Sequence, residues 1–151
     1  MKYLILLLSF LLLSLPATGA NYADMAHKAY KNKDYVKAAE YYEQAYQQDK
    51  SDVYLDNAIA AYLSHAFNLT NDKEYDQAIK YCEKVLSLKP GYSNAQELLC
   101  EIYYSRGTDS YFNGNGEEAR IHMEKSLQYS VLPEQKQRAL DELRDWKIQY
   151  Y

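Results

Sequence analysis

Three stretches of the chain decide its fold: DYVKAAEYYEQAY (34–46), EYDQAIKYCEKVL (74–86) and NGEEARIHMEKSL (115–127). Placed in register, they repeat one spacing of small and large apolar residues, and the copies begin 40 and 41 residues apart. This spacing keeps one face of a 3.6-residue helix apolar, with Arg120 as an exception at the edge of the last copy. Each stretch is therefore predicted to be one amphipathic helix of a repeat.

A second apolar-periodic stretch precedes each of these helices, at 21–33, 53–69 and 93–112. Turn-forming residues separate the two members of each pair, and the double Asn-Gly at 113–116 predicts a left-handed residue that ends a helix. Pro133 introduces a last helix over 134–150. No stretch is typical of a strand. The sequence thus predicts an all-α protein of seven helices.

This pattern resembles the tetratricopeptide repeat family. The residues that carry the resemblance are Tyr35, Ala38, Tyr42 and Ala45 in the first copy, Tyr75, Ala78, Cys82, Val85 and Pro90 in the second, and Ala119, Met123 and Ser126 in the third, with Gly107 as a small residue of the preceding helix. The family period is about 34 residues. The longer spacing here implies that helices 53–69 and 93–112 are extended or end in longer loops. Lys50 and Val131 stand where the family usually has proline.

The resemblance implies an α-solenoid of three helix pairs (about 21–52, 53–92 and 93–131) and a C-terminal capping helix, 134–150. One such pair cannot bury its own apolar face, so that three pairs and a cap are about the minimum for stability. We therefore expect residues 21–151 to form one helical-repeat domain.

The first twenty residues have the layout of a secretory signal peptide. Lys2 precedes an apolar run over 3–15, and small residues allow cleavage after Ala20 or after Gly19. The run is shorter than the ~20 residues that span a bilayer, so an uncleaved anchor is the weaker alternative. No cysteine follows it, so no lipoprotein is expected. We expect a periplasmic or secreted protein whose membrane contact is limited to this segment; in a eukaryotic source, Asn68 would lie in a glycosylation sequon.

Composition and motifs favour neither nucleic-acid binding nor catalysis. The chain has 17 Lys and Arg against 21 Asp and Glu, a net charge of −4, and no clustered basic run. His27, His65 and His122 lack the spacing of metal ligands, and no phosphate-binding loop or nucleophile motif occurs. We therefore expect no catalytic residues, no metal and no cofactor.

The two cysteines leave two alternatives open. An exported protein with an even number of cysteines can form a disulfide, and Cys82 and Cys100 flank the turn at Pro90-Gly91 at nearly equal distance. However, Cys82 lies on the apolar stripe of its helix, whereas Cys100 lies well away from the stripe of its own. They form either a disulfide or two separately buried thiols.

The first helices of tetratricopeptide repeats line the concave face, and here they carry residues that the apolar seam does not need. The candidates are His27, Tyr30 and Lys31 in the first pair, Leu63 and Phe67 in the second, and Tyr104, Thr108 and Tyr111 in the third. They predict an aromatic groove for an extended or helical peptide. The family's carboxylate clamp is not evident, since Ala23 and His27 occupy its places in the first pair. Alternatively, Tyr104 and Tyr111 cover the core beneath a neighbouring helix.

Together these features indicate a non-catalytic exported scaffold or adaptor that binds a protein or peptide through its concave face. The alternatives are a structural dimerising module or an accessory domain of an envelope enzyme complex. The chain is expected to be a monomer or a weak homodimer.

Overall fold

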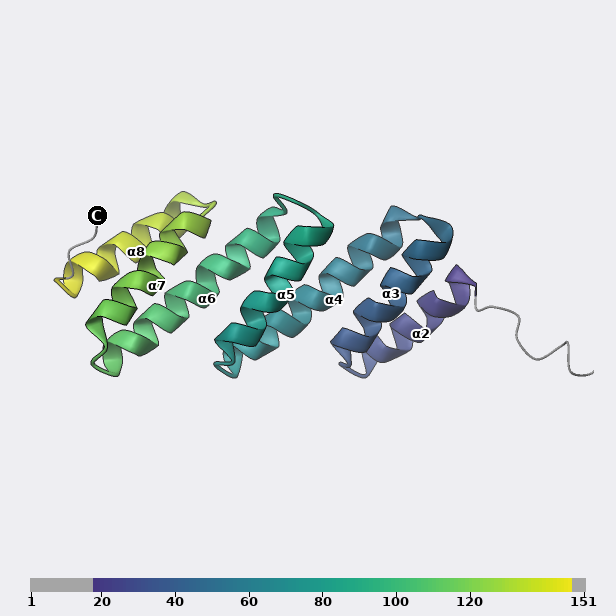
Figure 1. Cartoon of the computed structure of the whole chain (residues 1–151), viewed down its shortest axis with the longest axis horizontal. Coiled ribbons are helices and arrows are strands. Elements are labelled where there is room, and N and C mark those ends of the chain that lie inside the picture. The colour runs from purple at the N-terminus through teal and green to yellow at the C-terminus, as the bar shows by residue number, and fades with distance from the viewer. Residues whose placement is uncertain (1–17, 148–151) are drawn as a thin grey trace, which may run out of the picture. The chain divides into compact units, whose positions relative to one another are not determined.

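The computed structural model describes residues 18–147, and this part of the chain consists of α-helices joined by short turns (Figure 1). The helices are α2 (Gly19–Lys31), α3 (Tyr35–Asp49), α4 (Asp52–Asn71), α5 (Tyr75–Leu88), α6 (Ser93–Phe112), α7 (Gly116–Tyr129) and α8 (Pro133–Asp145). The predicted all-α fold is confirmed. Among these helices, none is long and apolar enough to cross a membrane. Residues 1–17 of the predicted signal segment lie outside the described range, while Gly19 and Ala20 belong to α2.

The chain divides into two compact units, the first ending at Ala58 and the second beginning at Ile59, so that α4 contributes to both. In the first unit, Ala26 of α2, Tyr42 of α3 and Ala58 of α4 form a buried cluster, with Tyr41 and Tyr54 packed against it. Small alanines on the facing sides of the helices permit close packing. The prediction of one continuous repeat domain over 21–151 stays a prediction.

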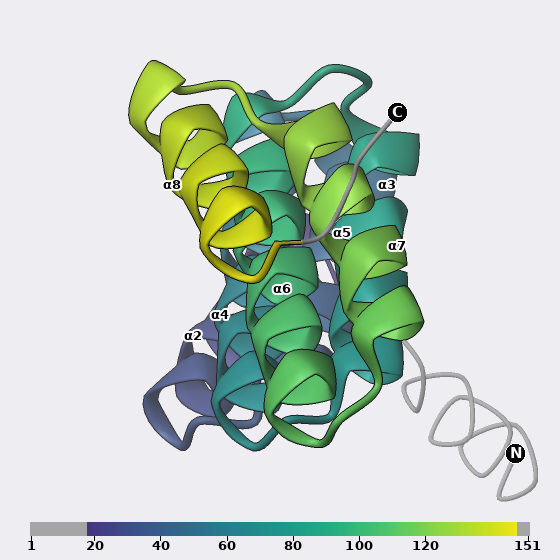
Figure 2. The same ribbon diagram turned by 90° about the vertical axis from the view of Figure 1, so that its left-hand side faces the viewer.

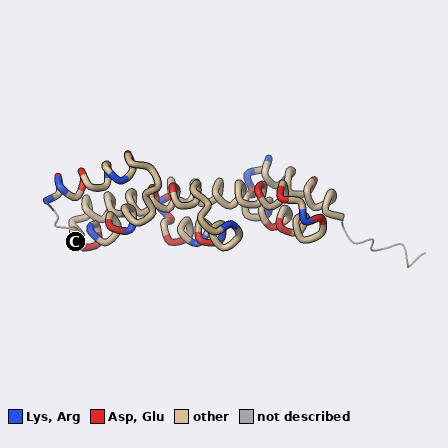
Figure 3. The backbone as a smooth tube through the Cα atoms, turned by 90° about the horizontal axis from the view of Figure 1, so that it is seen from above, with Lys and Arg blue, Asp and Glu red and all other residues tan. Residues whose placement is uncertain are grey.

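The second unit has two core clusters. The larger joins α4, α5 and α6 through Ala66, Leu69, Ala78, Cys82, Leu99, Ile102 and Tyr103. The smaller joins α7 to α8 through Met123, Ala139 and Leu143, and Tyr104, Leu127 and Trp146 pack against it. Figure 2 shows α8 lying beside α6 and α7. The apolar stripe of α8 thus faces its neighbours, while Figure 3 shows basic and acidic residues mixed along the same helix.

The first helix of every pair ends in the same way. Lys33, Lys73 and Gly114 have left-handed backbones with φ of 61°, 62° and 82°. The next residue in each case donates its N–H to a carbonyl five residues back: Asp34 to Ala29, Glu74 to Leu69 and Asn115 to Ser110. This is the Schellman arrangement. The left-handed residue predicted at 113–116 is confirmed, and lysine takes the same conformation in the other two pairs.

The length of the repeat lies in its first helices. Helices α4 and α6 have 20 residues each, whereas α5 and α7 have 14 each. Gly107 lets α6 approach α7 closely, since a Cβ there would lie 3.2 Å from side-chain carbons of Met123. The prediction that helices 53–69 and 93–112 are extended is confirmed, as is the role of Gly107 as a small residue.

Helix α8 is shorter than the predicted range 134–150. It ends at Asp145, because Trp146 caps it and Lys147 turns left-handed with φ of 55°. Residues 148–150 of the predicted helix lie outside the described range.

Candidate partner-binding surface

In the second unit, the last turns of α4 and the middle of α6 form a shallow cleft of about 330 Å³. We call this surface, with its two flanking phenylalanines, the first-helix face. The cleft is lined by Thr70, Asn71, Lys73, Tyr75, Tyr104, Ser105, Thr108 and Asp109. Two of the predicted groove residues, Tyr104 and Thr108, are therefore brought together here with polar residues of α4 that the sequence did not single out.

Two exposed aromatic rings flank the cleft. Phe67 lies one turn before Asn71 on α4 and is 57% exposed, and Phe112 lies one turn after Thr108 on α6 and is 78% exposed. Phe67 was predicted as a groove residue, whereas Phe112 was not. Its position four residues after Thr108 was the signal that could have identified it.

One wall of the cleft is a hydrogen-bonded charged group. Lys73 Nζ donates to Asp109 Oδ1 at 2.8 Å, and Tyr75 Oη donates to Asp109 Oδ2 at 2.7 Å. The hydrogen bond from Lys73 lowers the pKa of the Asp109 carboxyl, and burial together with this carboxylate raises the pKa of Tyr75. The group ties the α4–α5 turn to α6 and neutralises the charge at this wall.

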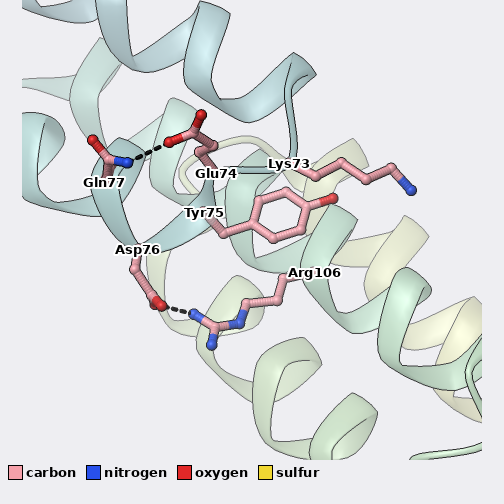
Figure 4. A pocket seen from close by; sticks show the side chains of 6 residues that line it. All are labelled: Lys73, Glu74, Tyr75, Asp76, Gln77 and Arg106. Atoms are coloured by element: carbon pink, nitrogen blue, oxygen red, sulfur yellow. Dashed lines mark hydrogen bonds and ion pairs between the residues drawn. The ribbon is translucent and has the colours of Figure 1, made fainter.

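A second shallow cleft of about 320 Å³ adjoins this wall at the start of α5 (Figure 4). Arg106 Nη1 lies 2.5 Å from Asp76 Oδ1, and Gln77 donates to Glu74. Because its prominent cation is paired within the cleft, we assign this site a role in joining α5 to α6.

Helix α8 covers the part of α6 that carries Tyr104 and Tyr111 (Figure 2). Tyr104 Oη donates to Glu142 Oε1 at 2.8 Å, and the Arg138 guanidinium lies 4.0 Å from the Tyr104 ring centroid. Tyr111 stacks on Trp146 with ring centroids 4.2 Å apart and planes 7° apart. Burial and the Glu142 contact raise the pKa of Tyr104 to about 12. The structure therefore favours the alternative in which these two tyrosines support a neighbouring helix.

Two other predicted groove residues have local structural contacts. Leu63 packs against the larger core cluster of the second unit, so it contributes to the core instead of an open groove. Thr108 Oγ1 donates to the Tyr104 carbonyl at 3.0 Å, although its side chain lines the cleft. Helical periodicity placed both on the correct helix but could not show which neighbour covers Leu63.

In the first unit, His27, Tyr30 and Lys31 lie on the exposed side of α2. The His27 ring meets Tyr42 edge-on at 5.5 Å, and Tyr30 meets Tyr35 edge-on at 5.1 Å. Their part in binding stays a prediction.

Both cysteines are free, buried thiols in different surroundings. Cys82 belongs to the larger core cluster, whereas Cys100 Sγ lies 3.3 Å from Ser126 Oγ of α7. Burial raises the pKa of Cys82 to about 12 and also raises that of Cys100. The structure thus has the two separate thiols and not the disulfide. Among residues 18–147, no group of three His, Cys, Asp or Glu could hold a metal ion.

No family model and no curated protein matches the chain. Two solved structures are similar. One is the N-terminal domain of stress-induced protein-1 (STI-1) from C. elegans, with a TM-score of 0.42 and 21% identity, covering 85% of this chain and 94% of that one. The other is the first TPR of Spaghetti (RPAP3) bound to the HSP90 peptide SRMEEVD, with a TM-score of 0.32 and 22% identity, covering 89% and 95%. At these scores, neither likeness says what this chain binds.

The structure's own repeated features define its architecture. Each pair consists of a first helix with a left-handed C-terminal cap and a second helix with an apolar stripe that begins three to five residues later. The chain is an all-α protein built from helix pairs of the tetratricopeptide repeat type.

Proposed function

We propose that the protein is an exported, non-catalytic scaffold that binds a protein or peptide partner through the first-helix face of its second unit. The observation that carries this proposal is the pair of exposed phenylalanines, Phe67 and Phe112, which flank a polar cleft. Large apolar side chains exposed beside a cleft are typical of binding surfaces, where aromatic residues supply most of the affinity.

The character of the cleft favours an uncharged peptide segment. Its only charged lining residues, Lys73 and Asp109, are hydrogen-bonded to each other. The remaining lining residues are tyrosines, hydroxyl side chains and the amide of Asn71. Side-chain packing on the two phenylalanines and hydrogen bonds from this neutral floor would hold such a segment.

The proposal of export rests on the sequence of the first twenty residues. Mass spectrometry of the native protein is expected to find an N-terminus at Ala20 or Asn21. Intact Met1 in a protein that remains in the cytoplasm would contradict export.

Site-specific photo-crosslinking tests the binding surface. A benzophenone amino acid would replace Phe67, Phe112 or, as a control, Ile121, which is 40% exposed on the second helix α7. We expect a partner adduct from positions 67 and 112 but not from 121. Equal adducts at all three positions, or none at 67 and 112, would refute the assignment. An adduct between two copies of the chain, together with a dimer in light scattering, would favour the dimerising role.

A further inference from the structure

Each helix pair contains two stacked aromatic rings at the same repeat position. Tyr22 faces Tyr41 in the first unit, with ring centroids 6.3 Å apart. In the second unit, Tyr62 faces Tyr81 at 5.8 Å, and Tyr103 faces His122 at 6.2 Å. Positions 41, 81 and 122 are separated by the repeat spacing of 40 and 41 residues. The third pair therefore has a titratable imidazole where the other two have a phenol.

The imidazole of His122 is enclosed and has no hydrogen bond. Only 7% of the residue is exposed, while Tyr41 and Tyr81 are half-buried. Neither Nδ1 nor Nε2 finds a hydrogen-bond partner among residues 18–147. The ring is held by stacking on Tyr103, with the planes 24° apart. A neutral imidazole can occupy this position, but a buried imidazolium would need two acceptors for its two N–H groups.

Charged groups from three helices face this ring. On its own helix, Glu118 Oε1 lies 3.9 Å from Nε2, beyond hydrogen-bond distance, and Lys125 also acts on it. From α6 comes Arg106, and from α5 comes Asp76, which is paired with Arg106. Burial and then Arg106 are the main causes that lower the pKa of His122, and Glu118 opposes them. The two cations and the enclosure thus outweigh the two carboxylates.

We propose that His122 is a pH-sensitive switch in the second unit, whose protonation loosens the packing of α7 on α6. An unfolded histidine takes up its proton near pH 6.5, whereas folded His122 does so only at lower pH. The contribution to stability is therefore complete above about pH 6.5 and is lost as the pH falls toward the folded pKa. Each unit between the two pKa values lowers the folding equilibrium constant about tenfold.

Loosening of α7 would reach the C-terminal helix. Met123, the residue after His122, is fully buried between α7 and α8 with Ala139 and Leu143. Trp146 packs against this cluster and is the chain's single tryptophan. Acidification should therefore release α8 as well, and the Trp146 fluorescence should report it.

Urea unfolding at about pH 7.5 and about pH 5.5, within the range where histidine titrates, tests the switch. It would be followed by circular dichroism and by Trp146 fluorescence for the wild type, His122→Gln, His122→Tyr and the control His27→Gln. We expect the wild type and His27→Gln to lose the same stability on acidification, and both position-122 variants to lose clearly less. An unchanged pH dependence in His122→Gln would overturn the proposal.

Direct titration of the wild-type protein decides the matter even if a variant fails to fold. The NMR signal of the His122 ring should titrate below pH 6.5, with a concurrent change in the signals of Tyr103 and Trp146. Titration at or above pH 6.5, or without change in these two side chains, would equally refute the switch.

Discussion

Truncation of Tyr104 to alanine is expected to lower the free energy of unfolding of the second unit by about 3 kcal/mol. Truncating a fully buried aromatic residue costs ~3–5 kcal/mol, and for the half-buried ring of Tyr104 we take about 2 kcal/mol. The hydrogen bond to Glu142 adds about 1 kcal/mol. The cation–π contact with Arg138 adds ~0.5 kcal/mol.

Urea unfolding followed by Trp146 fluorescence measures this loss, because the indole packs against the same small cluster as Tyr104. Tyr104→Phe is the matched variant. It keeps the ring and removes only the hydroxyl that donates to Glu142, so we expect it to lose about 1 kcal/mol.

The control is Tyr30→Ala on α2, where the side chain is 39% exposed and lies outside this unit. It should cost about 1 kcal/mol or less. If Tyr104→Ala destabilises no more than Tyr30→Ala and instead abolishes partner crosslinking, Tyr104 is a groove residue and its assignment as a support for α8 is wrong.

Three further predictions follow from other contacts. Gly107→Ala should lower stability by about 1 kcal/mol in thermal unfolding, because crowding of Met123 by the new methyl outweighs the gain in helix propensity; a higher melting temperature would contradict the close approach of α6 to α7. Cys82 and Cys100 should not react with a thiol reagent in the native protein and should both react in urea, whereas a mass two hydrogens lower would reveal a disulfide. The lowered pKa of Asp109 contributes stability that is present above about pH 4 and is lost as the pH falls through the folded pKa, so Asp109→Asn should flatten this acid dependence in urea titrations; an unchanged profile would show that its hydrogen bond from Lys73 does not persist in solution.

The local elements could be predicted because their causes are local. The 3, 4 spacing of apolar residues is enough to place a helix, as the match between 74–86 and α5 shows. The left-handed cap at Gly114 follows from the Asn-Gly sequence. Gly107 was identified as a small residue from the repeat register, and its close contact with Met123 is the physical reason for that register.

The binding surface depended on contacts between segments far apart in the chain. Periodicity placed Tyr104 and Tyr111 away from the apolar seam of α6, but only the tertiary structure shows that α8 covers both. It likewise buries Leu63 against the core and encloses His122. Helical spacing determines which side chains share a face, because that geometry is set by the backbone of a single helix. Which face becomes core, which is covered by α8 and which stays open beside Phe67 and Phe112 is decided by the packing of several helices, which no single segment encodes.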